Sequence, residues 1–121
     1  MRGSGAACIL LYEQSVIFSE PSIVARHEAQ AEFLQAVGQA TRLRILEVLA
    51  EGERCVCDIQ AAVGQQQSNV SKHLAILRRS GILAARREGG RVLYRLRNGR
   101  IPEFLRRLSD LVSRDFFGSV T

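Results

Sequence analysis

The stretch VCDIQAAVGQQQSNVSKHLAILRR, residues 56–79, decides the fold. Apolar residues recur in it at helical spacing on both sides of Gly64. They are Val56, Ile59 and Val63 before the glycine and Val70, Leu74 and Leu77 after it. Two helices joined by a short glycine-containing turn form a helix-turn-helix, whose second helix enters the major groove of DNA. We therefore predict a helix over 56–63 and a recognition helix from about Gln66 to Ser80.

The flanking segments complete a mostly helical plan. Thr41 is expected to cap a helix, Gly89-Gly90 is typical of a tight hairpin turn, and Pro102 suits the first turn of a helix. The expected elements are a helix over 23–37, a helix between Thr41 and Gly52, strands over 83–88 and 91–96, and a helix over 101–117. The order α-α-α-α-β-β-α is mainly α with a β-hairpin wing, which is a winged helix-turn-helix.

Composition indicates one domain in a reducing compartment. A chain of 121 residues, 46% of them apolar, can bury one core. We assign residues 23–117 to a DNA-binding and dimerisation domain, 1–22 to an arm and 118–121 to a short tail. No apolar run approaches the ~20 residues of a membrane span, and the N-terminus lacks the pattern of a secretory signal. Three cysteines do not make a disulfide framework, so we expect a reduced, cytoplasmic protein without membrane contact.

The charge pattern indicates a polyanionic partner. Net charge is +5, and of the 17 basic residues only Lys72 is a lysine. Arginine forks match phosphate oxygens, and neutralised phosphates release counterions. Polar side chains lie opposite the apolar positions of the recognition helix, and arginines follow that helix and flank the hairpin. The expected DNA contacts are Gln67, Ser68, Ser71, Lys72, His73, Arg78, Arg87 and Arg91, with His73 either packing or contacting phosphate.

These features resemble the ArsR/SmtB family of winged-helix repressors over roughly residues 33–112. The most specific parts of the resemblance are Cys-Val-Cys-Asp at 55–58, Ser-Asn-Val-Ser at 68–71 followed by His73-Leu74, and the wing from Gly81 to Tyr94. The resemblance implies a homodimer that binds an operator inverted repeat in double-stranded DNA, represses transcription and dissociates when an inducer binds. It also implies that Gln67, Ser68, Ser71 and Lys72 carry DNA contacts. Gln66 departs from the pattern, because the family often has a capping hydroxyl residue there.

Two of the three cysteines, Cys55 and Cys57, stand one residue apart at the start of the 56–63 helix. The resemblance implies an inducer site there for As(III), Sb(III), Cd(II) or Pb(II), with no permanent cofactor. With Cys55 just outside the helix and Cys57 in its first turn, the sulfurs can converge. The helix N-terminus and Arg54 favour thiolates, which soft ions prefer. Cys8 on the arm is the candidate third ligand, and a single arm cysteine favours As(III) or Sb(III), because the cadmium/lead branch typically has two.

Several alternatives remain beside a metalloid sensor. They are a Cd(II)/Pb(II)-responsive repressor, a repressor switched by oxidation or persulfidation of the same cysteines, and a module that binds no DNA. Zinc- and nickel-sensing relatives carry Asp and His ligands on the last helix, whereas residues 101–117 hold Asp110 and Asp115 but no histidine. His27 is expected on a solvated face. Neither a phosphate-binding loop nor a nucleophile motif indicates an enzyme.

The position of the two thiols suggests how an inducer releases DNA. Bonds to Cys55 and Cys57 are expected to pull on the start of their helix and shift the turn at Gly64. The two recognition helices of a dimer then no longer match successive major grooves. The helix beginning near Ile23 and the apolar stripe of the last helix are the predicted dimer surface, because so small a monomer cannot cover both.

Overall fold

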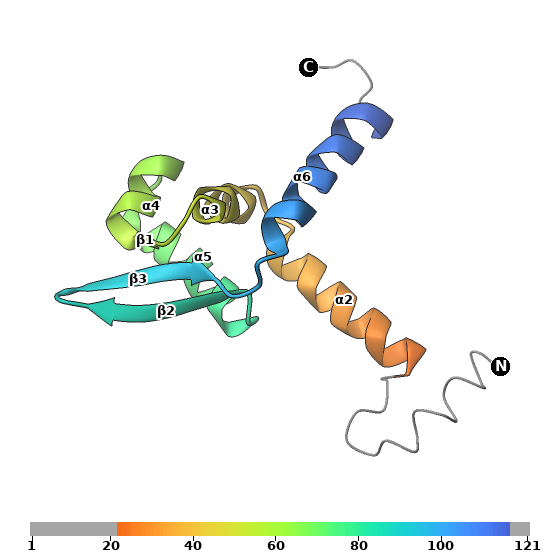
Figure 1. Cartoon of the computed structure of the whole chain (residues 1–121), viewed down its shortest axis with the longest axis horizontal. Coiled ribbons are helices and arrows are strands. Elements are labelled where there is room, and N and C mark those ends of the chain that lie inside the picture. The colour runs from red at the N-terminus through yellow and green to blue at the C-terminus, as the bar shows by residue number, and fades with distance from the viewer. Residues whose placement is uncertain (1–21, 117–121) are drawn as a thin grey trace. The chain divides into compact units, whose positions relative to one another are not determined.

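The computed structural model describes residues 22–116 and confirms the winged helix-turn-helix (Figure 1). Its elements are α2 (Ile23–Val37), α3 (Ala40–Ala50), β1 (Arg54–Cys55), α4 (Val56–Val63), α5 (Gln67–Arg79), β2 (Leu83–Glu88), β3 (Arg91–Leu96), α6 (Ile101–Leu111) and the π-helical turn η2 (Val112–Phe116). The predicted tail and all of the predicted arm except Ser22 lie outside the described residues. The chain divides between Phe33 and Leu34 into two units, and the packing described below belongs to the second.

The wing is an antiparallel hairpin with a two-residue turn. Glu88 of β2 stands opposite Arg91 of β3, so Gly89-Gly90 is the whole connection. Gly89 has a positive φ of +63°, whereas the φ of Gly90 is not positive. A positive φ at the first central position alone is the pattern of a type II′ turn, whose twist matches that of the strands. The predicted hairpin and its bounds are confirmed.

A third strand, which no pattern in the sequence predicts, joins the wing to the cysteine segment. Arg54 of β1 pairs with Tyr94, and Cys55 pairs with Leu93, so that the strand order is β1-β3-β2. A two-residue strand shows no alternation of its own, because the period of a strand needs about four residues to appear. Its existence depends on β3, which lies far along the chain.

The core lies where α3, α4, α5 and the start of β2 meet. Its fully buried side chains are Ile45, Leu46, Ile59, Val70, Leu74, Leu77 and Leu83. Ile59, Val70, Leu74 and Leu77 occupy positions that the helical spacing on either side of Gly64 predicted. Burial of each such side chain contributes about 1.5–3 kcal/mol relative to an exposed position, so the helix-turn-helix is held mainly by apolar packing.

Two local expectations were wrong. Thr41 does not cap α3; the N-cap is Gln39, whose Oε1 accepts a hydrogen bond from the Arg42 backbone N–H at 3.0 Å. Thr41 is buried in the first turn instead, where its Oγ1 accepts from the Gln65 side chain at 2.8 Å. The last α-helix ends at Leu111 and continues as the π-helical turn, whereas the sequence predicted one helix to residue 117. In the part of the chain that the structure describes, no helix has the length and apolar character to cross a bilayer.

Candidate nucleic-acid interface and thiol site

The turn between α4 and α5 depends on Gly64. This residue is the C-cap of α4 with φ of 72°, a left-handed conformation that costs a glycine least. Its N–H donates to the Gln60 carbonyl, and the chain then enters α5 with Gln66 as the N-cap. The glycine therefore sets the direction in which the second helix leaves the first.

The two faces of α5 differ as the sequence predicted. Val70, Leu74 and Leu77 are fully buried. The predicted contact residues of the other face, Gln67, Ser68, Ser71 and Lys72, are all exposed. Their side chains carry hydroxyl, amide and ammonium groups, which suit base edges and phosphates. The helix thus presents a polar row while its apolar row fixes it to the core.

Two side-chain hydrogen bonds that no local sequence pattern predicts hold the start of α5 against α3. The Gln65 amide donates to the Thr41 hydroxyl at 2.8 Å, and the Asn69 amide donates to the Gln65 carbonyl oxygen. Thr41 and Gln65 are 24 residues apart, so local spacing could not reveal the contact. The two bonds restrain the turn residue and the first turn of the recognition helix together.

His73 lies in a packing contact rather than on the exposed row of α5. Its Nδ1 accepts a hydrogen bond from Arg42 Nε at 3.2 Å, and Arg42 Nη1 donates to the Ala36 carbonyl at 2.8 Å. Partial burial, reinforced by the Arg42 charge, lowers the pKa of His73 below its ordinary value. Arg42 therefore ties the recognition helix to the end of α2 through a neutral imidazole. This is the packing role that the sequence allowed for His73.

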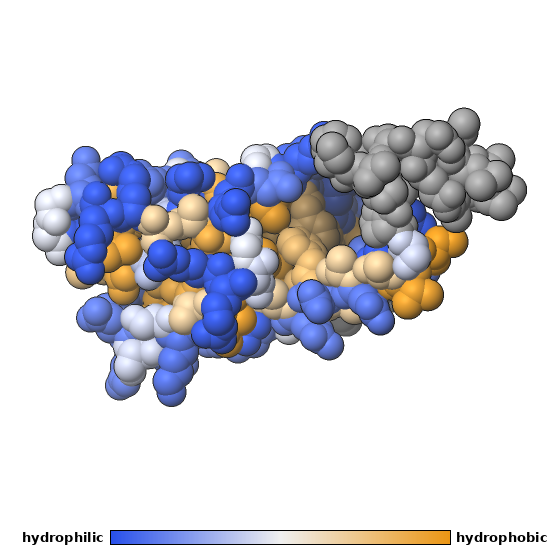
Figure 2. Space-filling model, turned by 90° about the horizontal axis from the view of Figure 1, so that it is seen from below, coloured by the Kyte–Doolittle hydropathy of each residue, from blue (hydrophilic) through white to orange (hydrophobic). Residues whose placement is uncertain are grey.

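The predicted basic contacts at the end of α5 and on the wing are exposed, whereas Arg86 of β2 is held in an ion pair. Arg78, Arg87 and Arg91 are exposed, and Figure 2 shows hydrophilic residues gathered over the part of the molecule that holds the wing. Arg86 instead forms a two-pronged ion pair with Glu53, at 2.9 Å and 2.8 Å. Its hydrogen bond lowers the pKa of Glu53, and the same bond raises the pKa of Arg86.

The two described cysteines stand where the sequence placed them but differ in exposure. Cys55 is the N-cap of α4, and Cys57 lies in the first turn of that helix. Both are free thiols; Cys55 is only 6% exposed, whereas Cys57 is exposed. Cys8, the predicted third ligand, lies outside the described residues. Among the side chains that the structure describes, residues 22–114, no group of three or more His, Cys, Asp or Glu could hold a metal ion.

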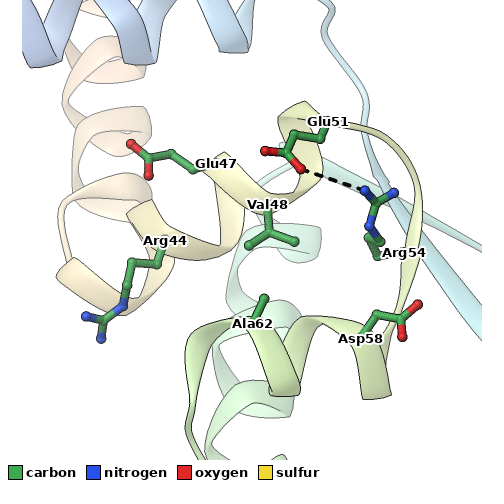
Figure 3. Close-up of a pocket in the computed structure, with 7 residues that line it drawn as sticks. All are labelled: Arg44, Glu47, Val48, Glu51, Arg54, Asp58 and Ala62. Atoms are coloured by element: carbon green, nitrogen blue, oxygen red, sulfur yellow. Dashed lines mark ion pairs between the residues drawn. The ribbon is translucent and has the colours of Figure 1, made fainter.

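Arg54, expected to favour the thiolates, is directed elsewhere. Its Nη2 lies 3.9 Å from a Glu51 oxygen, and its Nη1 donates to the Glu53 carbonyl at 2.9 Å. Figure 3 shows the pocket between α3 and α4 that it lines. The lining residues are Arg44, Glu47, Val48, Glu51, Arg54, Asp58 and Ala62. Because adjacent strand residues point to opposite faces, the side chains of Arg54 and the buried Cys55 diverge, and the Arg54 guanidinium faces the Glu51 carboxylate instead.

A recognition helix beside a basic two-stranded wing defines a winged helix-turn-helix DNA-binding protein. Residues 39–85 match the family model described as bacterial regulatory protein, arsR family. The chain is 41% identical over 80 residues to the arsenical resistance operon repressor of Escherichia coli, which covers 65% of this chain and 68% of that protein. It is 35% identical over 103 residues to a transcriptional repressor SmtB homolog of Synechocystis, which covers 84% of this chain and 78% of that protein.

A solved structure agrees with these relatives. The homodimeric winged helix-turn-helix DNA-binding domain from Mycobacterium bovis superposes with a TM-score of 0.66 at 31% identity, covering 78% of this chain and 92% of that one. The chain therefore belongs to the ArsR family. It is a transcriptional repressor of the ArsR/SmtB type that binds DNA, and it is not an enzyme.

Proposed function

We propose that this repressor binds an operator inverted repeat as a homodimer and dissociates when As(III) or Sb(III) binds its cysteine thiolates. One observation carries the proposal: Cys55 and Cys57 occupy the N-cap and the first turn of α4, immediately before the recognition helix. Thiolates are the donors that soft ions prefer, and helix N-termini stabilise them. The similarity to the Escherichia coli arsenical resistance repressor supports the metalloid over other soft ions.

The DNA contacts in this proposal come from α5 and the wing. The exposed side chains Gln67, Ser68, Ser71 and Lys72 would meet base edges and phosphates in the major groove. Arg78, Arg87 and Arg91 would follow the phosphate backbone. His73 would act through its contact with Arg42, which sets the position of the helix.

The proposed dimer surface is apolar. Ile23, Val24 and Leu34 of α2 are 58%, 65% and 55% exposed, and Leu111 of α6 is 46% exposed. Large apolar side chains left in water favour association. The homodimeric Mycobacterium bovis domain supports the same assembly for this chain.

The proposed inducer site is three thiolates, with Cys8 of the arm as the third ligand. Each As–S bond forms as one thiol proton and one hydroxide of As(OH)₃ leave as water, so three cysteines complete a pyramidal site. Metal–thiolate bonds at Cys55 and Cys57 would pull on the start of α4 and shift the turn at Gly64. If the ion binds the DNA-free dimer more tightly than the DNA-bound dimer by a few kcal/mol, this difference is enough to dissociate the repressor from its operator.

Fluorescence anisotropy of the reduced, full-length protein on a duplex from its own promoter tests this function. Near-stoichiometric As(III) should release the wild-type protein, and Cys55→Ser or Cys57→Ser should abolish release without abolishing DNA binding. Loss of response in Cys8→Ser would support the third ligand. Release by Cd(II) but not As(III) would move the repressor to the divalent-metal branch. Release by peroxide or polysulfide alone would favour a thiol switch, for which the exposed Cys57 is the accessible group.

A further inference from the structure

Three residues form one row across the sheet of the wing. Cys55 of β1 stands opposite Leu93 of β3, and Leu93 stands opposite Arg86 of β2. Residues directly opposite one another on neighbouring strands project to the same face. The two buried side chains, Cys55 and Leu93, therefore share a face with the base of the Arg86 side chain.

The Arg86 side chain connects the two edges of this sheet. Its Nε donates to Glu53 Oε2 at 2.9 Å, and its Nη2 donates to Glu53 Oε1 at 2.8 Å. Glu53 lies two residues before Cys55, in the segment that enters β1, whereas Arg86 belongs to β2 on the other side of β3. The ion pair thus spans the central strand and fastens the cysteine segment to the wing.

The burial of Cys55 means that an ion cannot reach both thiols in this conformation without a change. Cys55 is 6% exposed, whereas Cys57 is exposed. Protein interiors are close-packed, and As(III) with two sulfur ligands still needs room for a third ligand and a lone pair. Capture of one ion by both thiols would therefore require Cys55 to move outward, which would separate the two-residue β1 from β3 and move Glu53 with it.

We propose that Glu53 and Arg86 form a latch that keeps Cys55 covered and holds the wing in its DNA-binding position. The latch is opened when an inducer captures Cys55 and Cys57, so this part of the inference rests on the proposed function. Opening frees β2 from the cysteine segment and lets the tip residues Arg87 and Arg91 leave the phosphate backbone. Glu53 and Arg86 are positioning residues: they act on DNA through the wing.

The direction in which Glu53→Gln changes DNA affinity distinguishes a latch from a simple effect of net charge. Glu53→Gln removes a negative charge, and by charge alone a protein that binds phosphates should then bind DNA more tightly. The latch predicts the opposite, about a threefold loss of affinity, which is the scale of one exposed ion pair. Glu51→Gln makes the same charge change on a more exposed carboxylate outside the latch and should leave affinity unchanged or tighter.

Thiol accessibility gives a second readout that needs neither DNA nor inducer. In a full-length Cys8→Ser/Cys57→Ser background only Cys55 reacts with monobromobimane, with the thiol sulfur displacing bromide. Adding Glu53→Gln or Arg86→Gln should accelerate this alkylation about threefold, and Glu51→Gln should not. Circular dichroism verifies that each variant keeps its helices.

The outcomes separate this inference from the proposed function. If Glu53→Gln matches Glu51→Gln in both DNA affinity and Cys55 alkylation, the latch is overturned, whatever As(III) does to the wild type. If the latch variants behave as expected while As(III), Cd(II) and oxidants leave wild-type DNA binding unchanged, the latch stands and the inducer proposal fails. If all arms succeed, Glu53→Gln should also release DNA at a lower As(III) dose than the wild type.

Discussion

The recognition helix and the cysteine segment are attached to the molecule by different means. α5 is anchored by Val70, Leu74 and Leu77, three fully buried apolar side chains. The cysteine segment is attached to the wing by a two-residue strand and by the ion pair of Glu53 with Arg86, whose side chains are 26% and 50% exposed. Apolar burial resists local opening, whereas short ladders and exposed ion pairs open readily. The contrast indicates that the recognition helix α5 is held rigidly, whereas a ligand can displace the neighbouring cysteine segment.

The largest expected effect on stability comes from a substitution in the buried face of α5. Leu74→Ala should destabilise the fold by about 2–5 kcal/mol, because the cavity it leaves lies in the centre of the core. Urea unfolding followed by circular dichroism measures the change. Leu111→Ala, at a 46% exposed position on α6, is the control and should cost far less to the folded monomer. A small effect at Leu74 would mean that α5 is not held by its apolar face.

The second effect compares the two thiols. Cys55→Ser buries a hydroxyl and should cost about 1–3 kcal/mol, whereas Cys57→Ser at the exposed position should stay within about 0.5 kcal/mol. Cys55→Ala separates the polar penalty from the loss of volume. Equal urea midpoints for the two serine variants would contradict the buried position of Cys55 in the ligand-free protein.

The features that could be predicted from the sequence are the local ones, and the features that were missed join residues far apart in the chain. Helical spacing placed α4, α5 and their buried positions, and two β-prone runs around Gly89-Gly90 placed the hairpin, because each signal is local and repeated. β1 was missed, since two residues carry no period. The bonds of Arg42 with His73 and of Glu53 with Arg86 join residues 31 and 33 apart in sequence, and no local pattern encodes such a pairing. The sequence thus predicted the helices, the hairpin and the exposed contact residues of α5, but not the long-range hydrogen bonds and the ion pair that connect the elements.

A third effect isolates DNA contact from stability. Lys72→Ala should weaken DNA binding several-fold and reduce the salt slope of binding by about one, because one phosphate contact is lost. Its stability should change by less than about 0.5 kcal/mol, since the side chain is exposed. Anisotropy titrations at several salt concentrations measure both quantities. Arg106→Ala, which removes an exposed cation on α6, is the matched control and should leave the salt slope unchanged.

The smallest effect concerns the contact that ties α5 to α3. Burial and the Arg42 charge lower the pKa of His73, so the unfolded chain binds a proton more readily than the folded one. The contribution of His73 to the free energy of unfolding is therefore fully present above the ordinary histidine pKa of about 6.5. It is lost as the pH falls below that value toward the lowered pKa of the folded state. Protonation also turns Nδ1 from an acceptor into a donor facing Arg42 Nε, which breaks their hydrogen bond.

Urea unfolding at a series of pH values from 7.5 to about 5 tests this dependence. In His73→Gln the amide oxygen can accept from Arg42 without titrating, so the part of the slope that belongs to His73 should vanish while the fold persists. His27→Gln, at an exposed position on α2, should leave the slope as it is in the wild type. If His73→Gln keeps the full slope, the imidazole is not the group that couples α5 to α3. The acid sensitivity of the fold then arises elsewhere, and α5 is held by its apolar face and by the Gln65–Thr41 hydrogen bond without a contribution from His73.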